Sequence, residues 1–526
     1  MRRYPAAVRA AIVALILLLL FVPGARAFEG QGPVGWQPPN QFSHLSDQPR
    51  YVVLIIIDGG LPAYLKLADF PHLAALERHG IMYTHAWDGI LETETPTGHA
   101  TIGTGSFPRR HGVLSFSWVT DGDVVEHPTN PIPIQQGQLE DVLHRSGVPS
   151  LASLVKQHDR NDQIVVTSGH KDYAVDSVGG WAADYLMYYK VIGQTWAPVA
   201  IPRHVPPRSV IQAPNLTYFA PHLYPGKQDS LAVDLAMSAF QQIHQKVTII
   251  NLPEFDWPLG HLQGGIRDSW LAWKLMEQFD SDLSYIEWTY AQAHVLNKTL
   301  FVVTADHGML SLNHAVPHAS IEQAVAAAGT SLVDYDFHTS GYLWLRDRAK
   351  APEVAANILA LHNPLIHAVY YRQPGSYQYI RASNIHRLAS PEVDAAYQYL
   401  LGTMASPSAP QVVIFLRENS SVLGRNQRTW LGDHGGASWN AEHVPLLFAG
   451  AGVRHGVQST YPATIYDIAP TILALLGIAP HGMDGVPLAN AMTDPDLSYL
   501  QAQQAQGQEL APLVRALRYQ TSRDGR

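Results

Sequence analysis

The 526-residue chain contains no cysteine. It can therefore form no disulfide and cannot carry a lipid on an N-terminal cysteine, so the fold must be stabilised by its core. Basic residues are also scarce: 35 Lys and Arg face 44 Asp and Glu, and the formal charge is -9. Proteins that follow a nucleic-acid backbone are usually basic. We therefore expect no specific nucleic-acid binding.

Long apolar runs are absent after residue 27, so we expect no transmembrane span in the mature protein. Residues 1–27 combine an arginine-rich start, an apolar stretch over 10–22 and a small-x-small cleavage site, Ala25-Arg26-Ala27. The apolar stretch is about 13 residues long, which is short for a bilayer-spanning helix. This pattern predicts a cleavable signal peptide and a periplasmic or secreted bacterial protein, with an uncleaved anchor as the alternative.

Continuous apolar runs alternate with segments of helical spacing along the rest of the chain. The runs that favour strands are 51–57, 164–167, 247–251, 300–304, 411–416 and 444–449. Helical spacing is found at 67–79 and 269–294. This alternation predicts an α/β fold with a mostly parallel central sheet and helices on both faces. In such sheets, ligands bind beyond the carboxyl ends of the strands.

The chain is predicted to contain one large domain with insertions. Residues 28–50 are an irregular lead-in, and 51–490 form the domain. Two segments break the alternation, at about 174–229, which is dense in Pro, Tyr and Trp, and at about 310–410. We expect both to be insertions that cap the ligand site. Residues 491–526 are a tail whose Gln- and Ala-rich composition allows a helix.

Seven residues with metal-binding side chains lie close to strand-like runs at five places in the chain. They are Asp58 in IIIDGG, Thr95 in ETPTGH, Asp256 and His261 in FDWPLGH, Asp306 and His307 in TADHGM, and His434 in GDHGG. Each has an ordinary explanation when taken alone, such as a turn, a helix cap or a solvated histidine. Side chains delivered by separate strand ends can, however, surround two cations. Mixed histidine and carboxylate ligands suit catalytic zinc.

Thr95 lies just before a stretch of small residues that can begin a helix. Its hydroxyl is a poor nucleophile unless a metal or a base activates it. Two cations roughly 3.5–4 Å apart can ionise such a nucleophile and neutralise the leaving oxygen. A helix N-terminus beneath a phosphoryl group would add N–H donors. Thr93 and Thr97 remain alternatives, and the pattern favours a metal-dependent hydrolase of phosphate esters.

The ordered motifs IIIDG, T-P-T-G-H-A-x-x-x-T-G-x-x-P-x-x-H-G, D-x(4)-H, T-A-D-H-G-M, H-G-G and EHVPLLFAGAG resemble the alkaline phosphatase superfamily. Within it, the type I phosphodiesterase/nucleotide pyrophosphatase branch is the most similar, over about Tyr51 to Leu488. The resemblance implies two Zn²⁺ ions and a phospho-threonine intermediate on Thr95, which water then hydrolyses. It assigns one ion to Asp58, Thr95, Asp306 and His307, and the other to Asp256, His261 and His434.

The sequence departs from the family pattern at two places near these motifs. Asp256 and His261 are five residues apart, where relatives have four, and Pro258 lies between them, so this turn must bulge. Phe116 stands where relatives have an Asn that donates to the phosphoryl group. Ser115 or Ser117 would have to supply that donor, or nothing does.

A third departure concerns the Lys-x-Arg pair of monoesterase relatives. Lys171 matches the lysine and can meet a terminal phosphate, whereas Tyr173 cannot supply a guanidinium fork. A solvated surface lysine is the alternative for Lys171. The candidate substrate-binding residues are therefore Lys171, Phe116 and Ser117.

These observations predict an exported two-zinc hydrolase of phosphodiester or pyrophosphate bonds, acting on small-molecule phosphate esters. A phosphomonoesterase is the nearest alternative, and a phosphoryl-group transferase and a binding protein that has lost catalysis are further ones. The segment 106–110 matches the sulfatase signature S-x-P-x-R. We set a sulfatase aside, because that match arises from the T-G-x-x-P motif which overlaps it.

Overall fold

The computed structural model describes residues 45–524, with gaps at 121–122, 127–136, 212, 267–268, 374, 383–387, 389 and 424–429. The predicted signal peptide and most of the lead-in lie outside the described residues. Within the described ranges, no helix is both long enough and apolar enough to cross a membrane.

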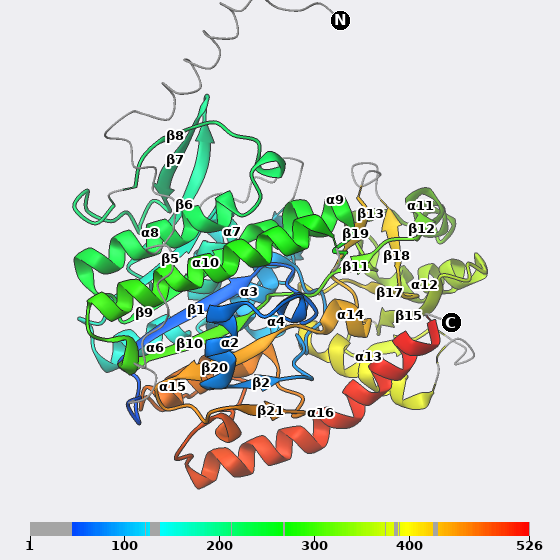
Figure 1. The fold of residues 1–526 in the computed structure, drawn as a ribbon. Coiled ribbons are helices and arrows are strands. Elements are labelled where there is room, and N and C mark those ends of the chain that lie inside the picture. The colour runs from blue at the N-terminus through cyan, green and yellow to red at the C-terminus, as the bar shows by residue number, and fades with distance from the viewer. Residues whose placement is uncertain are drawn as a thin grey trace, which may run out of the picture.

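The larger part of the molecule is built on a ten-stranded sheet (Figure 1). In spatial order its strands are β21 (Val457–Ser459), β2 (Gly80–Tyr83), β20 (Leu446–Gly450), β10 (Thr299–Thr304), β1 (Tyr51–Ile57), β9 (Val247–Leu252), β5 (Ile164–Ser168), β6 (Tyr185–Ile192), β7 (Thr195–Ala200) and β8 (Leu216–Thr217). The five strands from β10 to β6 are parallel, and Leu54 lies between Val302 and Ile249. Strands β20 and β7 flank them in antiparallel pairing. The predicted α/β fold is confirmed, and 174–229 supplies the β6–β8 edge of its sheet.

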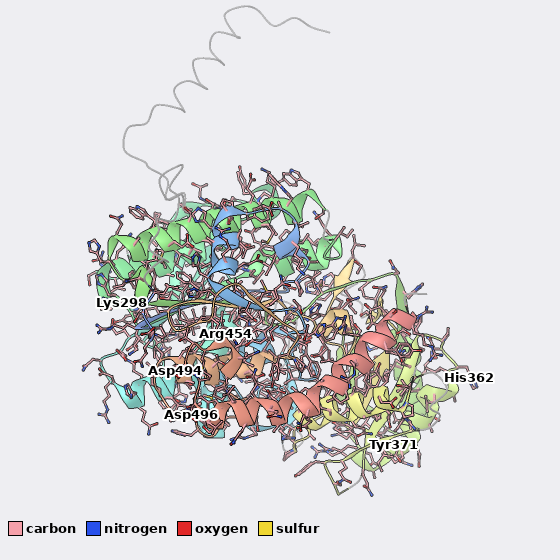
Figure 2. All side chains as sticks on the ribbon, turned by 60° about the horizontal axis from the view of Figure 1, so that its bottom comes forward. Lys298, His362, Tyr371, Arg454, Asp494 and Asp496 are labelled. Carbon is pink, nitrogen blue, oxygen red and sulfur yellow. The ribbon has the colours of Figure 1, made fainter. Side chains whose placement is uncertain are left out.

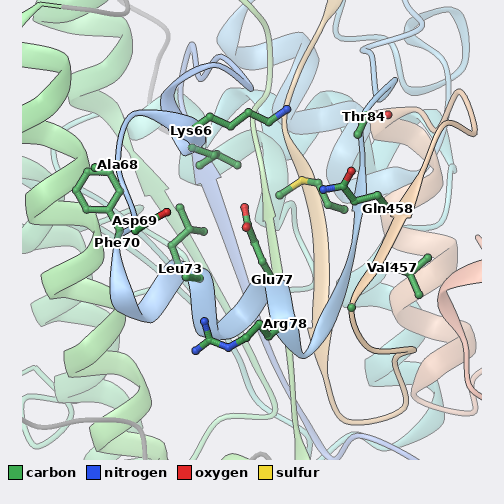
Figure 3. Close-up of a pocket in the computed structure, with 14 residues that line it drawn as sticks. Lys66, Ala68, Asp69, Phe70, Leu73, Glu77, Arg78, Thr84, Val457 and Gln458 are labelled. Carbon is green, nitrogen blue, oxygen red and sulfur yellow. The ribbon is translucent and has the colours of Figure 1, made fainter.

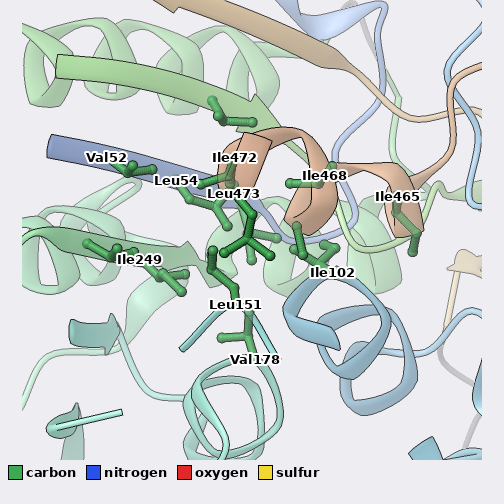
Figure 4. Close-up of a cluster of buried hydrophobic side chains, with 14 of the residues drawn as sticks. Val52, Leu54, Ile102, Leu151, Val178, Ile249, Ile465, Ile468, Ile472 and Leu473 are labelled. Atoms are coloured by element: carbon green, nitrogen blue, oxygen red, sulfur yellow. The ribbon is translucent and has the colours of Figure 1, made fainter. Parts of the chain in front are cut away.

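Helices cover both faces of this sheet, and for that reason its central strand β1 is apolar at every position. Val53, Ile55 and Ile57 face one layer, made of α2 (Pro71–Arg78), α8 (Lys227–Ile243) and α10 (Trp270–Gln292). Val52, Leu54 and Ile56 face the other layer, made of α3 (Thr95–Thr104), α6 (Leu151–His158), α7 (Asp172–Gly179) and α15 (Ile468–Leu475). Figure 4 shows Ile102 of α3 and Ile468 of α15 in this second cluster. The core thus fixes α3 against the sheet.

A second, smaller sheet accounts for most of the predicted insertion at 310–410. Its antiparallel strands, in spatial order, are β13 (Leu332–Phe337), β14 (Ser340–Leu345), β17 (Val412–Leu416), β15 (Ile366–Arg372) and β16 (Tyr379–Arg381). Its helices are α11 (His318–Ala327), α12 (Ala351–Ala360) and α13 (Pro391–Met404). The run at 411–416 is therefore a strand of this sheet and not of the central one.

The C-terminal tail is one long helix, α16 (Leu497–Asp524). It contacts η10 (Ala489–Ala491) beside the main sheet, and α13 and α14 (Trp439–Glu442) towards the smaller one. Leu510, Val514 and Leu517 are buried in that contact. Figure 2 shows the helix running from Asp496 towards the lobe that carries Tyr371 and His362. The tail thus ties the two lobes together.

Short elements complete the chain. They are η2 (Tyr64–Lys66), α4 (Pro108–His111), β3 (Trp118–Thr120), β4 (Asp123–Glu126), α5 (Gln138–Ser146), η3 (Pro221–Leu223), η4 (Pro253–Phe255), η5 (Asp256–Gly260), α9 (His261–Gln263), η6 (Leu296–Lys298), β11 (Leu310–Ser311), β12 (His314–Pro317), η7 (Arg348–Lys350), β18 (Ser420–Leu423), β19 (Gly432–Asp433) and η9 (Ile465–Asp467).

Candidate active site

The seven residues predicted to bind metal come together at the carboxyl edge of the parallel strands. Asp58 follows β1 and Asp306 follows β10, while Asp256 follows β9 after one short turn. Thr95 begins α3, which is buried along its whole length. All seven side chains belong to residues at most 6% exposed. Residues as much as 376 positions apart in the sequence, such as Asp58 and His434, thus form one buried site.

Asp58, Asp306 and the Thr95 hydroxyl form one half of the site. Thr95 Oγ1 lies 3.4 Å from Asp58 Oδ1, and the Gly59 N–H donates to Asp306 Oδ1 at 3.1 Å. His307 Nε2 is 3.5 Å from both Asp58 Oδ1 and Asp306 Oδ2. Burial disfavours the His307 imidazolium, but Asp306 and Asp58 outweigh burial and raise its pKa to about 9. This half of the site therefore has a negative potential that would favour a cation.

Asp256 and His261 form the other half together with His434. The five-residue spacing is accommodated by η5, a π-type turn in which the His261 N–H donates to the Asp256 carbonyl. Trp257 leaves helical geometry inside this turn, so the chain bulges there. The π-turn puts residues i and i+5 on one side, and His261 Nε2 lies 3.2 Å from Asp256 Oδ1. His434 Nε2 lies 3.7 Å from the same oxygen.

The three imidazoles share one arrangement. The Nδ1 atoms of His261, His307 and His434 lie 2.9–3.0 Å from the backbone carbonyls of Gly432, Gly308 and Thr93. Each Nε2 is thereby left to face the carboxylates. Metal-binding histidines are held in this way, because a donor bond from one ring nitrogen fixes the tautomer that ligates through the other.

The structure groups the ligands differently from the family pattern. Ligand atoms of Asp256, His307 and His434 lie within 4.8 Å of one another, as do those of Asp58, His99 and Asp306. The rings of His307 and His434 stack with centroids 3.7 Å apart. His307 therefore stands between the two halves of the site.

Lys171 lies inside this site, so the surface alternative for it is wrong. The residue is 2% exposed. Its Nζ donates to Asp58 Oδ1 and Asp256 Oδ2, both at 2.7 Å, and lies 3.3 Å from Thr95 Oγ1. Burial opposes ionisation of Asp58, but the Lys171 ammonium outweighs it and lowers the pKa of that carboxyl to about 2. Lys171 supplies the positive charge where the two halves meet.

The other predicted substrate-binding residues lie beside Lys171. Phe116 packs edge-on against Tyr173 with ring centroids 5.0 Å apart, and Lys171 Nζ lies 5.9 Å from the centre of the Tyr173 ring. Ser117 is fully buried and, among the described residues, its hydroxyl has no hydrogen-bond partner. Ser115 Oγ instead donates to Asp336 and to Glu94.

Two polar residues of the site were not predicted as site residues. Asn251, near the end of β9, donates from Nδ2 to Asp58 Oδ2 at 2.8 Å and lies 3.1 Å from His99 Nε2. His99 Nδ1 is 3.1 Å from Asp306 Oδ2 and 2.9 Å from the Thr95 carbonyl. An amide in the apolar run TIINL was the available signal, because a polar side chain in a doubly covered strand needs a partner.

The donor set fits divalent cations. Asp256 Oδ1, Asp306 Oδ2 and His307 Nε2 are buried and, in the described part of the chain, have no hydrogen-bond partner. Buried polar atoms are normally satisfied, so such atoms at one place indicate a missing ligand. A groove between α2 and the β2–β21 edge, with Leu73, Glu77 and Gln458 in its walls, is lined by none of the predicted site residues (Figure 3). This groove is thus separate from the cluster of residues at the carboxyl edge.

Comparison with known proteins agrees with this geometry. Residues 52–437 match the family model described as type I phosphodiesterase / nucleotide pyrophosphatase. Human ectonucleotide pyrophosphatase/phosphodiesterase 5 covers 84% of this chain over 100% of its own, at 15% identity and a TM-score of 0.59. Wild-type alkaline phosphatase PafA covers 85% of this chain over 99% of its own, at 14% identity and a TM-score of 0.63.

One curated protein is similar in sequence over a shorter stretch. Alkaline phosphatase PhoD of Zymomonas mobilis is 24% identical over 118 residues, which are 21% of this chain. The match spans about a fifth of that relative's length (20%). The model that spans residues 52–437 decides the family. The chain belongs to the type I phosphodiesterase / nucleotide pyrophosphatase family, whose members are metal-dependent phosphoric ester hydrolases.

Proposed function

We propose that the protein is an exported hydrolase of phosphodiester or pyrophosphate bonds in small molecules, with two zinc ions and Thr95 as its nucleophile. One observation carries the proposal: three imidazole Nε2 atoms and three carboxylates converge beside the Thr95 hydroxyl. Export is part of the proposal because of the signal-like sequence at 1–27.

The residues divide into two ligand sets. Asp58, Thr95, Asp306 and His307 would hold one ion, and Asp256, His261 and His434 the other. Histidine and carboxylate ligands with open positions suit zinc. Bound there, the ions would lower the pKa of the nucleophile and neutralise the oxygens of an in-line displacement.

The position of Thr95 supports its proposed role as the nucleophile. Its side chain begins α3, so the N-terminal end of that helix faces the site and favours a negatively charged phosphoryl group. The hydroxyl attacks phosphorus, one ester oxygen leaves as an alcohol that takes up the threonine proton, and a phospho-threonine that keeps the second ester group of a diester is formed. Water then cleaves the new P–O bond and restores Thr95. Lys171, 3.3 Å from Thr95 Oγ1, can donate to a phosphoryl oxygen during both steps.

The Phe116–Tyr173 pair supports a diester rather than a monoester. Tyr173 stands where monoesterase relatives have an Arg, and Phe116 stands where relatives have an Asn; both of those residues donate to phosphoryl oxygens. A bound monoester dianion would lack the two hydrogen-bond donors that the Asn and the Arg supply. The second ester group of a diester would instead pack against the Phe116 and Tyr173 rings. Loss of a hydrogen bond to a charged group costs roughly 1.5–3 kcal/mol.

A phosphomonoesterase is the second candidate because Lys171 is buried in the site and not on the surface. An ammonium at that position can pair with a terminal phosphate oxygen. Turnover of bis-p-nitrophenyl phosphate and p-nitrophenyl phosphate by the zinc-loaded protein separates the two candidates. We expect kcat/KM to be higher for the diester, and a large excess for the monoester would reverse the order.

Exchange of the aromatic pair sharpens this test. The double variant Phe116→Asn/Tyr173→Arg restores both donors, so we expect kcat/KM for the monoester to rise relative to the diester by about tenfold or more. Phe116→Leu/Tyr173→Phe is the matched control, which keeps the wall apolar and should leave the ratio unchanged. Thr95→Ala should abolish both activities. If Thr95→Ala keeps its turnover, the nucleophile is wrong.

A further inference from the structure

A second cluster of buried ionisable groups lies apart from the seven residues. Glu94 precedes α3, Asp336 is in β13, and His338 follows β13. His338 Nε2 pairs with a Glu94 oxygen and lies 2.9 Å from Asp336 Oδ1. Ligand atoms of these three residues lie within 4.8 Å of one another, and none of the residues is more than 8% exposed. The smaller lobe thus brings an imidazole and a carboxylate to the start of α3.

Glu92 adds a further carboxylate to the same cluster. It is fully buried, and neither of its carboxylate oxygens has a hydrogen-bond partner in the described residues. The charged groups acting on it are Asp336, Glu94 and His338, so its side chain points into the cluster. An ionised carboxylate buried without a donor is costly. The described residues therefore provide no hydrogen-bond donor to Glu92, and a bound ligand could take that place.

The Nδ1 atom of His338 is held by a carboxylate, as is common for histidines that bind a metal through Nε2. Its Nδ1 lies 2.8 Å from Asp433 Oδ1, and Asp433 Oδ2 accepts a hydrogen bond from Ser421 at 2.9 Å. A carboxylate behind an imidazole fixes the tautomer and leaves Nε2 to ligate a metal. Here Nε2 faces Glu94 and Asp336.

The cluster contains more carboxyl groups than basic groups. Glu92, Glu94, Asp336 and Asp433 are four carboxylates, and His338 is the one imidazole among them. In the described part of the chain, no lysine or arginine pairs with any of the four. These carboxylates would be costly to ionise without a cationic partner, and a divalent cation would offset that cost.

We infer that Glu92, Glu94, Asp336 and His338 bind a third divalent cation, separate from the two proposed at Thr95. Three carboxylates and one imidazole nitrogen are a ligand set suited to Mn²⁺ or Zn²⁺. Ser115, whose Oγ lies 3.1 Å from Glu94 Oε2, can add a hydroxyl oxygen.

The third cation would act as a positioning element and not as a catalytic one. Glu94 directly precedes Thr95 in the chain, and Asp433 directly precedes His434. The His434 carbonyl accepts a hydrogen bond from the Thr339 hydroxyl of the smaller lobe at 2.8 Å. An ion between these segments would fix the nucleophile and one zinc ligand to the same point. The ring centroids of His338 and His434 are 5.7 Å apart.

The ion count in a protein without the catalytic sites tests this inference independently of the proposed function. In Asp256→Asn/Asp306→Asn, we expect one tightly bound Mn²⁺ per chain, measured by elemental analysis and by its electron paramagnetic resonance signal. Addition of Glu92→Gln/His338→Gln should remove that ion. Retention of the ion after this addition, or no ion in the parent double variant, would overturn the inference.

Two further variants guard against misfolding as an explanation. Asp433→Asn should weaken Mn²⁺ binding by roughly 10–100-fold without removing a ligand. Glu287→Gln changes another buried carboxylate paired with a histidine, His72, outside the cluster, and should leave the ion count unchanged. The rise of Tm with Mn²⁺ should vanish only in the cluster variants. An equal rise in Glu92→Gln/His338→Gln would contradict the site.

Discussion

Replacement of Gly98 by alanine tests whether the placement of α3 against the Asp306 backbone sets the geometry of the site. A Cβ at Gly98 would lie 2.2 Å from the Asp306 carbonyl oxygen and 2.9 Å from its carbonyl carbon. Both are backbone atoms, so no side chain can give way. To reach an ordinary contact of 3.4 Å, the two segments must separate by about 1.2 Å.

That separation is expected to cost activity far more than stability. Thr95 and Asp306 would move apart, and a misplacement of about 1 Å can cost roughly 100-fold in rate. Overpacking costs about 1–3 kcal/mol, whereas alanine within a helix gains up to about 1 kcal/mol over glycine. We expect the free energy of unfolding to fall by at most about 2 kcal/mol while kcat falls about 100-fold.

The assay compares kcat for bis-p-nitrophenyl phosphate with the urea midpoint of unfolding in the same preparations. Gly402→Ala in α13 is the matched control, because a Cβ there would meet no atom within 4 Å. It should keep full activity and gain slightly in stability. A Gly98→Ala enzyme with kcat within twofold of the native value would refute the reasoning.

The remaining predictions concern metal and pH. Asp306→Ala should lose one cation and nearly all turnover, because nucleophile activation and charge neutralisation disappear together; elemental analysis and kcat check this. Chelation of the native protein should lower its Tm, because an ion at 100 times its Kd contributes about 2.7 kcal/mol to stability. Burial, with a smaller effect of Arg110, lowers the pKa of His111 to about 3. Its unfolded pKa is about 6.5, so stability should fall as pH falls between these values. His111→Gln should lose less stability from pH 7 to 5 in urea titrations, and an identical loss would contradict the assignment.

The parts of the fold that the sequence predicted best are those buried on both sides. The run YVVLIII is β1 over the predicted residues, because each of its positions is apolar and packs against a helical layer. The sequence was less informative about the sheet to which each strand belongs. The segment 411–416 has the same apolar character, yet it pairs within the smaller sheet. Apolar content alone does not say which sheet a strand joins.

The site residues that directly follow a strand were predictable from the sequence. Those that come together through contacts between the two lobes were less predictable. Asp58 and Asp306 sit at the ends of adjacent parallel strands, so their proximity follows from the strand order. The burial of Lys171 depends on the course of the chain after β5, which no local pattern shows. Asp336 and His338 reach Glu94 only because the smaller lobe folds back on the start of α3. Contacts of this kind are set by tertiary packing.

Anomalous X-ray diffraction at the zinc edge, from crystals of the zinc-loaded protein, tests the central claim most directly. We predict two peaks beside the Thr95 hydroxyl, one among Asp58, Asp306 and His307 and the other among Asp256, His261 and His434. No peak at these residues, or peaks that leave the Thr95 hydroxyl out of contact with any ion, would contradict the account.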